Sequence, residues 1–270
     1  MHQITFLGTG GGRFVILTQR RYSGGIWLEF NEVSIILDPG PGALIRALQF
    51  KKNPNKLDAI LVSHNHLDHY NDAEVLIEAM THGANRKKGI LVTTKETLNY
   101  ISEYHKNVVK AVLTPMPKEK FMVSSVNIEA LPTFKHSNGI GFKFFTKEGI
   151  VTYTADTAFS ENLLKSYKGS KILILNTIFP HDREIDTHLN TKMAIKIIQE
   201  TKPKIAIITH FGMQMLNANP DREAKIIEKE TKIRTIAAKD GMTITLEKCD
   251  KEGINQQGKE KDMQLKLMEF

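Results

Sequence analysis

The feature that most constrains this chain is a loop of histidines and an aspartate that directly follows an apolar, strand-like run. The run covers residues 59–62, and the segment Ser63–His69 after it reads Ser-His-Asn-His-Leu-Asp-His. Side chains two apart in an extended loop point to one side, so His64 and His66 can bind one cation together. The aspartate and the last histidine, at the following turn, can face a neighbouring cation. A lone histidine is usually a surface or core residue, but this spacing indicates a metal site.

Cysteine usage limits the chemistry of such a site. Cys249 is the only cysteine among the 270 residues, so any metal must be held by imidazole and carboxylate groups. That donor set suits zinc, and manganese, iron and cobalt are compatible with it. The single thiol also excludes a disulfide within the chain, as expected in a reducing cytoplasm.

Strand-like and helical patterns alternate along the chain without a repeat or a long linker. The second half contains a predicted hairpin, residues 140–145 and 150–154, and a strand–helix–strand unit with a potential helix cap at Asn190 or Thr191. The other predicted strands are residues 4–7, 26–30, 33–37, 59–62, 171–175, 205–208 and 242–246, and the other helices are residues 72–80 and 221–230. The first and second halves of the chain thus each contain strands mixed with helices. This organisation predicts an α/β fold of two sheets packed face to face, with helices outside.

The two ends of the sequence bear on the domain boundary and on the cellular compartment of the protein. The residues after Cys249 are polar, so we expect one domain over residues 1–248 and a tail over residues 249–270. The first residues resemble a strand and not a signal peptide. No run of about 18 apolar residues is present, which excludes a membrane-spanning helix. These features predict a cytoplasmic protein without a membrane partner.

The net charge bears on the partners. It is +7 and comes from 37 basic and 30 acidic side chains. Such a balance favours polyanionic partners, above all nucleic acid. The basic residues are scattered, however, and the densest clusters, residues 51–52 and 86–88, are short. A solvated, lysine-rich surface explains the same charge, and both interpretations stay open.

Several motifs together resemble the metallo-β-lactamase superfamily, and the resemblance covers nearly the whole chain. His64–His69 has that family's His-x-His-x-Asp-His pattern. Leu7–Gly12 and Leu37–Gly42 resemble turns of the ribonuclease Z and cyclic-phosphodiesterase (PhnP-like) branches. Tyr153–Thr157 resembles the segment with the bridging aspartate, and Thr209–Phe211 the segment with the last metal-binding histidine. The resemblance implies a four-layer αβ/βα sandwich, two mixed β-sheets flanked by helices, with metals at one edge between the sheets.

The resemblance implies that the chain binds two divalent cations, expected to be Zn²⁺, with Mn²⁺ or Fe²⁺ as alternatives. It also assigns the ligands of each cation by their positions in the sequence. A water between two such cations has a lowered pKa and supplies a nucleophilic hydroxide. The weakest assignment is His136, which rests on its place before the strand at residues 140–145. The first metal would take His64, His66 and His136, the second Asp68, His69 and His210, and Asp156 would bridge them.

The resemblance also implies catalytic roles outside metal binding. Asp68 could orient the hydroxide besides binding a metal. His188 resembles the ribonuclease Z histidine that faces the scissile phosphate, where it could protonate the leaving oxygen or stabilise phosphate charge. Its alternative role is local hydrogen bonding at the start of a helix. His181 is a weaker candidate for the same pocket, and we expect His2, His82 and His105 to be surface or cap residues.

Four positions are candidates for support and substrate binding. Asp38 could hydrogen-bond a ligand imidazole from behind, although an aspartate before Pro39 also suits a turn. Gly10 and Gly11 could let backbone amides approach a phosphate, although tight turns need glycine anyway. Arg13 could contact a polyanion or lie on a solvated face.

The spacing of the motifs bears on the substrate. The arm with which bacterial and archaeal ribonuclease Z enzymes grip tRNA would lie between His136 and Asp156, an interval with room here only for the predicted hairpin. This disfavours tRNA 3′ maturation. A metal-dependent phosphodiesterase acting on a cyclic phosphate, a small nucleotide or a short nucleic acid fits better. A ribonuclease Z-like endoribonuclease and a thioester, lactone or β-lactam hydrolase are the alternatives.

Two interpretations from other classes fit less well. A di-iron oxidoreductase of this fold typically has a glutamate at the position of His66 and joins a flavin-binding domain. Non-catalytic nucleic-acid-binding relatives usually lose metal ligands, whereas all seven are present here. Relatives are often dimers, so a homodimer is a further expectation, but the sequence does not locate an interface.

Overall fold

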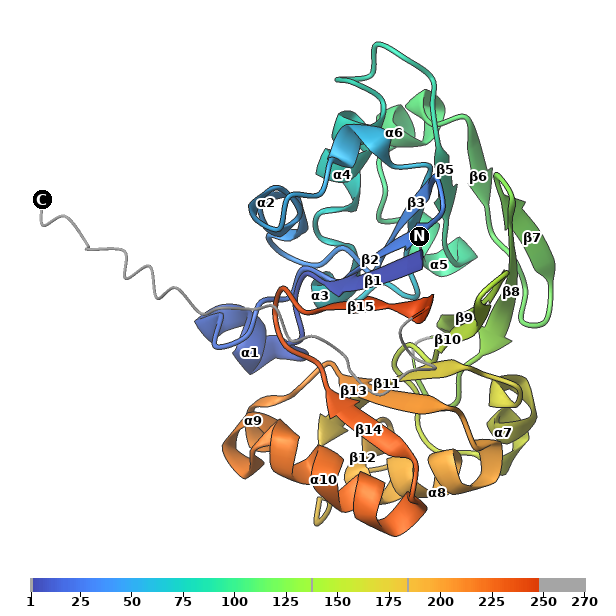
Figure 1. Cartoon of the computed structure of the whole chain (residues 1–270). Coiled ribbons are helices and arrows are strands. Elements are labelled where there is room, and N and C mark those ends of the chain that lie inside the picture. Colours follow the sequence, from blue (N-terminus) through green and yellow to red (C-terminus); the bar gives the residue numbers. More distant parts are fainter. Residues whose placement is uncertain (1, 137, 184, 248–270) are drawn as a thin grey trace, which may run out of the picture.

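The computed structural model describes residues 2–136, 138–183 and 185–247, and it consists of two β-sheets packed face to face with helices on both outer faces (Figure 1). This confirms the predicted four-layer sandwich of two mixed sheets. The predicted tail from residue 249 onward lies outside the described residues.

The first sheet has seven strands in the order β15-β1-β2-β3-β4-β5-β6. They are β1 (His2–Phe6), β2 (Ile26–Phe30), β3 (Val33–Leu37), β4 (Ala59–Leu61), β5 (Ile90–Val92), β6 (Ala111–Leu113) and β15 (Thr243–Thr245). Neighbours from β15 to β3 are antiparallel, whereas β3 to β6 run parallel. The carboxyl ends of β3 and β4 therefore lie side by side.

The second sheet follows the order β14-β13-β11-β10-β9-β8-β7, with β12 beside β11. Its strands are β7 (Lys120–Val123), β8 (Val126–Pro132), β9 (Ile140–Thr146), β10 (Gly149–Tyr153), β11 (Ile172–Phe179), β12 (Leu189–Asn190), β13 (Ile205–Thr209) and β14 (Arg234–Ala237). The strands β10, β11, β13 and β14 run parallel. Their carboxyl ends meet at one edge of this sheet as well.

The helices form the outer layers. They are α1 (Arg13–Thr18), α2 (Ala43–Gln49), η1 (Pro54–Lys56), α3 (Leu67–Tyr70), α4 (Ala73–Met80), α5 (Lys95–Leu98), α6 (Glu103–Val108), α7 (Glu161–Tyr167), α8 (Thr191–Thr201), α9 (Met213–Ala218) and α10 (Pro220–Thr231). Apolar side chains of α2 and α4 cover the first sheet, and those of α7, α8 and α10 cover the second (Figure 1). In the described ranges, no helix has the length and apolar character of a membrane span.

The main core lies between the two sheets. Phe30 of the first sheet packs against Phe144 of the second, with ring centroids 5.6 Å apart and both side chains fully buried. Burying one such side chain contributes about 1.5–3 kcal/mol. Alternating apolar residues on the inner faces, such as Ile4 and Phe6 of β1, extend this core along the strands. The strands are thereby held in register where they end at the candidate site.

The predicted elements are present with small shifts of their ends. Strands β2 and β3 have the predicted bounds, and the side chain of Asn190 accepts the N–H of Met193 at 2.8 Å at the start of α8. Strand β11 continues to Phe179, beyond the predicted end at residue 175, because it pairs with β13 up to Asn176 and then, with a shift of register, with β12. The unpredicted strands are β5 to β8, β12 and β14, and the unpredicted helices are α1, α2, η1, α3, α5, α6, α7 and α9.

The ends of four strands carry predicted site residues to a single edge of the sandwich. Asp38 follows β3, His64 lies just beyond β4, Asp156 follows β10 and His210 follows β13. Because two of these strands belong to each sheet, the edge brings together residues from both halves of the sequence.

Candidate metal centre

The histidine-rich loop folds as a strand end followed by one short helix. His64 lies just after β4, and His66 is in extended backbone immediately before α3. Asp68 and His69 lie within α3, so the chain turns between the two pairs. As a result, the first pair belongs to one group of candidate metal ligands and the second pair to another.

The first group consists of His64, His66, His136 and Asp156, whose ligand atoms lie within 4.8 Å of one another. Nε2 of His64 is 2.9 Å from Nδ1 of His66 and 3.2 Å from Nε2 of His136. Nε2 of His136 is 3.6 Å from Oδ2 of Asp156. Tetrahedral zinc, with bonds of about 2.0–2.1 Å to nitrogen, separates its ligand atoms by about 3.3–3.4 Å. The group therefore has the dimensions of a zinc site.

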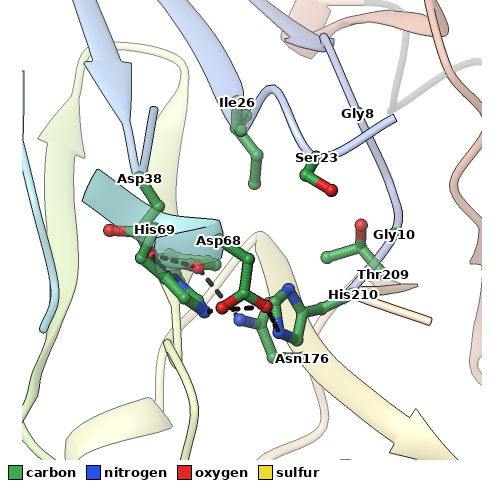
Figure 2. A pocket seen from close by; sticks show the side chains of 12 residues that line it. Gly8, Gly10, Ser23, Ile26, Asp38, Asp68, His69, Asn176, Thr209 and His210 are labelled. Carbon is green, nitrogen blue, oxygen red and sulfur yellow. Dashed lines mark hydrogen bonds and ion pairs between the residues drawn. The ribbon is translucent and has the colours of Figure 1, made fainter. Parts of the chain in front are cut away.

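The second group consists of Asp68, His69 and His210, which converge in Figure 2. Oδ2 of Asp68 is 4.0 Å from Nε2 of His69 and 3.5 Å from Nε2 of His210. Oδ2 of Asp156 lies 3.5 Å and 3.3 Å from the same two nitrogens. One oxygen of Asp156 thus faces both groups, which is the arrangement that the resemblance implies for it.

Two buried atoms of the second group have no hydrogen-bond partner among the described residues. Nε2 of His69 and Nε2 of His210 make no hydrogen bond, and a cavity of ≈ 20 Å³ borders them and Asp68. Burying an imidazole nitrogen without a partner is unfavourable by about 1–3 kcal/mol. A cation with nitrogen and oxygen ligands would satisfy both atoms, so the residues present fit a metal ion.

Most of the ligand groups are in the protonation state that a metal requires. Burial lowers the pKa of His64 well below its usual range and lowers that of His136 to about 4, so both imidazoles are neutral at pH 7. Burial alone would raise the pKa of Asp156, but the neighbouring imidazoles of His210 and His69 hold it well below its usual range. The carboxylate is therefore ionised.

His69 differs from the other imidazoles. Burial would lower its pKa, but the carboxylates of Asp156, Asp38 and Asp68 raise it well above its usual range. Three buried carboxylates around one ring require positive charge at this position. A proton on His69 or a metal cation beside it can supply that charge.

Asp38 supports the second group from behind. Its Oδ2 lies 2.8 Å from Nδ1 of His69, which is the contact proposed for it from the sequence. The same oxygen accepts the hydroxyls of Ser63 at 2.8 Å and of Tyr153 at 2.6 Å, and Oδ1 accepts the Ser63 N–H at 2.6 Å. These contacts fix the ring of His69 with Nε2 turned toward the other ligands.

Sequence reasoning assigned no role to two residues that support Asp156. The Asn176 Nδ2 group donates to Oδ1 of Asp156 at 2.7 Å and to the Tyr153 hydroxyl at 3.0 Å. Oδ1 is thereby occupied, and Oδ2 is left to face the histidines. The signal in the sequence is faint: Asn176 is a single amide after an apolar strand-like run.

His188 lies beside the two groups but belongs to neither. Its Nε2 is 3.5 Å from Oδ2 of Asp156, and its ring meets that of His136 edge to face at 4.5 Å between centroids. Nδ1 lies 3.0 Å from the hydroxyl of Thr187. The side chain is 21% exposed, so this imidazole is partly accessible to solvent beside the cluster.

The glycine-rich loop packs against the cluster in a way that the sequence did not predict. The N–H of Gly10 donates to the carbonyl of Tyr22 at 2.9 Å, and that of Gly11 to the carbonyl of Phe211 at 3.0 Å. These amides therefore bond within the chain, and an approach of Gly10 or Gly11 to a substrate stays a prediction. A Cβ at Gly11 would lie 2.3 Å from the ring of His210, so glycine is required for close packing.

The next two residues contact the site and the solvent. The N–H of Gly12 donates to Oδ2 of Asp68 at 2.7 Å, which helps to fix that carboxylate. Arg13 begins α1 and is exposed. A contact between Arg13 and a polyanionic substrate stays a prediction.

The remaining histidines considered above do not belong to either ligand group among the described residues. His105 lies in α6, 3.0 Å from Glu74 and 3.2 Å from Glu78. His82 is exposed after the end of α4, and His181 interacts with the adjacent Asp182. The placements of His82 and His105 agree with the expected surface and cap roles, but His2 is buried at the start of β1, so the expectation that it lies at the surface is wrong.

Comparison with known sequences identifies relatives of this chain. A family model described as the Beta-lactamase superfamily domain matches residues 34–211. The uncharacterized protein MJ1374 of Methanocaldococcus jannaschii is 34% identical over 255 residues, which cover 90% of this chain and 95% of that protein. Ribonuclease Z of Thermococcus sibiricus is 32% identical over 107 residues, which cover 40% of this chain and only 34% of that enzyme.

Solved structures share the fold. The metallo-β-lactamase fold protein YhfI of Bacillus subtilis superimposes with a TM-score of 0.77 at 19% identity, covering 91% of this chain and all of that one. Human tRNase Z, short form, gives a TM-score of 0.71 at 16% identity over 90% and 99% of the two chains. A diphosphatase from the PhnP family gives 0.69 at 17% identity over 91% and 98%. At these identities, the likeness concerns the fold.

Proposed function

The chain belongs to the metallo-β-lactamase superfamily of hydrolases, and on that premise we propose that it is a phosphodiesterase for a compact diester. The substrate class would be a cyclic phosphate, a small nucleotide or a short nucleic acid. The observation that carries the proposal is the position of His188, a non-ligand imidazole beside both candidate ligand groups. Cleavage of a phosphodiester needs a proton for the leaving oxygen, and an imidazole at such a place can donate it.

The seven clustered residues would hold two divalent cations, which we expect to be zinc. When bound, the cations would lower the pKa of a water and offset the charge on the phosphate. Asp68 would orient the attacking water, because its carboxylate belongs to the second group and is fixed by the Gly12 N–H. The ligands would be His64, His66, His136 and Asp156 in the first group and Asp68, His69 and His210 in the second, with Asp156 shared.

His188 would act on the side of the reacting phosphate opposite to the attacking water. The hydroxyl of Thr187 beside Nδ1 and the edge-to-face contact with His136 restrict the ring, so Nε2 points toward the cluster. From there it can donate a proton to the leaving oxygen or a hydrogen bond to a phosphate oxygen. General acid catalysis of this kind contributes about 10²–10⁴-fold to a rate.

The short hairpin that precedes Asp156 favours a small substrate. From residue 138 to Asp156, the structure contains only β9, β10 and their short connections. Nothing in this interval projects as an arm that could hold a folded tRNA. The similarity to ribonuclease Z and to a PhnP-family diphosphatase supports a phosphoester substrate in general. A ribonuclease Z-like endoribonuclease is therefore the second candidate function.

The test is a hydrolysis screen with zinc-replete protein. The substrates are bis-p-nitrophenyl phosphate, 2′,3′-cyclic nucleotides, a short RNA, a precursor tRNA, a thioester and a β-lactam. His66→Ala removes one candidate ligand, and His105→Ala, in the remote helix α6, is the matched control. We expect turnover of small diesters by the wild type and by His105→Ala, but not by His66→Ala.

The pattern of cleavage distinguishes the candidates. Efficient processing of precursor tRNA, with weak turnover of small diesters, would favour the endoribonuclease. Cleavage of the thioester or the lactam, with all diesters intact, would refute the phosphodiesterase proposal.

A further inference from the structure

A second cluster of metal-binding side chains lies at the opposite end of β1 from the candidate metal centre. His2 begins β1, Glu148 lies in the turn between β9 and β10, and Glu247 follows β15. One ligand atom from each lies within 4.8 Å of the others. Because β1 spans five residues, about 16 Å of strand separates this cluster from the end of β1 that leads to the candidate metal centre.

The cluster joins the two sheets at their edge. The N–H of His2 donates to Oε1 of Glu247 at 2.9 Å, which links β1 to the end of β15. The His2 ring lies 6.0 Å from that of Phe30, which packs on Phe144 of the other sheet. Glu148 belongs to a hairpin of that other sheet. The three residues thus come from three distant parts of the sequence.

Buried polar atoms without partners point into this cluster. The His2 side chain is 5% exposed, and its Nδ1 has no hydrogen-bond partner, although it lies 3.6 Å from Oε1 of Glu247. Oε2 of Glu247 is also buried, and it has no hydrogen-bond partner in the described part of the chain. Burying such atoms unpaired is unfavourable, and two orphan atoms on adjacent side chains indicate a missing shared partner.

We propose that His2, Glu148 and Glu247 bind a divalent cation, with zinc as the best match. One imidazole and two carboxylates leave a fourth position of a tetrahedral ion to water. The cation would neutralise the two carboxylates and pair the orphan nitrogen of His2. Its effect would be structural, because it ties the first strand and the end of β15 to the β9–β10 hairpin. The inference does not depend on the proposed phosphodiesterase activity.

The experiment measures zinc content and thermal stability of the full chain. Metal is removed with a chelator, zinc is added back, and unbound zinc is removed before zinc per chain is determined by mass spectrometry. Glu148→Gln removes one ligand at the hairpin turn and leaves the buried His2 in place. Glu200→Gln, an exposed glutamate of α8, is the matched control. His2→Gln is a second variant, which removes the only imidazole of the cluster.

We expect Glu148→Gln and His2→Gln to retain one zinc equivalent fewer than the wild type, while Glu200→Gln retains the full amount. Zinc at 100-fold above its Kd should raise the Tm by about 5 °C or more through this site, and that part of the rise should be lost in the two ligand variants. Equal zinc content and equal Tm rise in wild type and Glu148→Gln would overturn the proposal.

Discussion

The two edges of the sandwich carry the same kinds of side chain but surround them differently. At the candidate metal centre, three ring nitrogens that face away from the cluster have partners: Nδ1 of His69 contacts Asp38, that of His64 contacts Ser63 and that of His136 contacts the Thr187 carbonyl. At the opposite edge, Nδ1 of His2 faces the cluster and, like Nε2 of His69, has no hydrogen-bond partner among the described residues. The hydrogen bond from the His2 N–H to Glu247 joins two strands and does not orient a ligand ring. The difference lies in the supporting contacts and not in the ligands themselves.

This difference corresponds to the difference between a catalytic and a structural metal site. A catalytic site needs ligands held in one orientation, together with groups that act on the substrate, and outer contacts supply that orientation. A structural site needs only enough ligands to join parts of the chain. On this basis, we expect changes at the candidate metal centre to alter activity and changes at the His2 cluster to alter stability.

The largest effect is expected from loss of a ligand at the candidate metal centre. His66→Ala, or removal of metal with a chelator, should lower kcat/KM for a phosphodiester by more than about 10⁴-fold, beyond the range that loss of a general acid alone explains. Zinc should restore the chelated wild type but not the variant. The Tm rise assigned to the His2 cluster should persist in His66→Ala, because that cluster keeps its three ligands. Steady-state kinetics measure kcat/KM, and thermal unfolding measures the rise in Tm. An unchanged kcat/KM in His66→Ala would contradict the division between the two edges.

The next effect concerns His188, which contacts the cluster without belonging to a ligand group. His188→Ala should lower kcat by about 10²–10⁴-fold while the zinc content stays at the wild-type value. The loss should be smaller for bis-p-nitrophenyl phosphate, whose leaving group needs no proton, than for a cyclic nucleotide. A variant that loses zinc along with activity would show that His188 is a ligand and not an acid.

The ligand motif could be predicted from the sequence because its information is local. His64, His66, Asp68 and His69 lie within six positions after an apolar run, and their spacing alone indicates metal binding. His136 needed the family resemblance, because its neighbours form no distinctive motif. The structure then shows that it lies 3.2 Å from His64, a residue 72 positions away.

Contacts between distant residues explain what the sequence did not reveal. Tyr153 reads as the last residue of an apolar strand, and only folding brings its hydroxyl to Asp38, 115 positions away. Helix α1 was missed for a different reason. Phe14 and Leu17 are 72% and 79% exposed, so its apolar residues do not form the buried stripe by which amphipathic helices are recognised.

A smaller effect is expected when the support of His69 is changed. Asp38→Asn keeps the size of the side chain and tolerates the φ of 48° at this position. Its amide must replace an oxygen that accepts hydrogen bonds, so a donor will face another donor. We expect affinity for zinc to fall by about 10–100-fold and the free energy of unfolding to fall by about 1–3 kcal/mol. Competition with a chelator and denaturant unfolding measure these losses.

The control for that prediction is Asp58→Asn. Asp58 also accepts a backbone N–H, from Ser34 at 2.9 Å, but lies outside both metal-binding clusters. It should change zinc affinity at neither edge. Equal zinc affinity in Asp38→Asn and the wild type would mean that the ligands need no support from behind, and the distinction between the two edges would fail.

The smallest effect should come from Tyr153→Phe, which tests how far the supporting network reaches. The Tyr153 hydroxyl donates to Asp38 and accepts from Asn176, so it connects the residue behind His69 with the residue behind Asp156. Its removal leaves one buried acceptor and one buried donor with a partner fewer, which should cost about 1–3 kcal/mol of stability and up to about 10-fold in zinc affinity.

Tyr167→Phe provides the matched comparison for Tyr153→Phe. Tyr167, the last residue of α7, is fully buried, and its hydroxyl has no hydrogen-bond partner among the described residues. Its loss should therefore leave stability and zinc affinity near the wild-type values. Both variants remove one hydroxyl from a buried ring, and only one of them changes the network. If the two variants have the same stability and the same zinc affinity, the hydroxyl of Tyr153 does not couple the two ligand groups, and the support of each group must act independently.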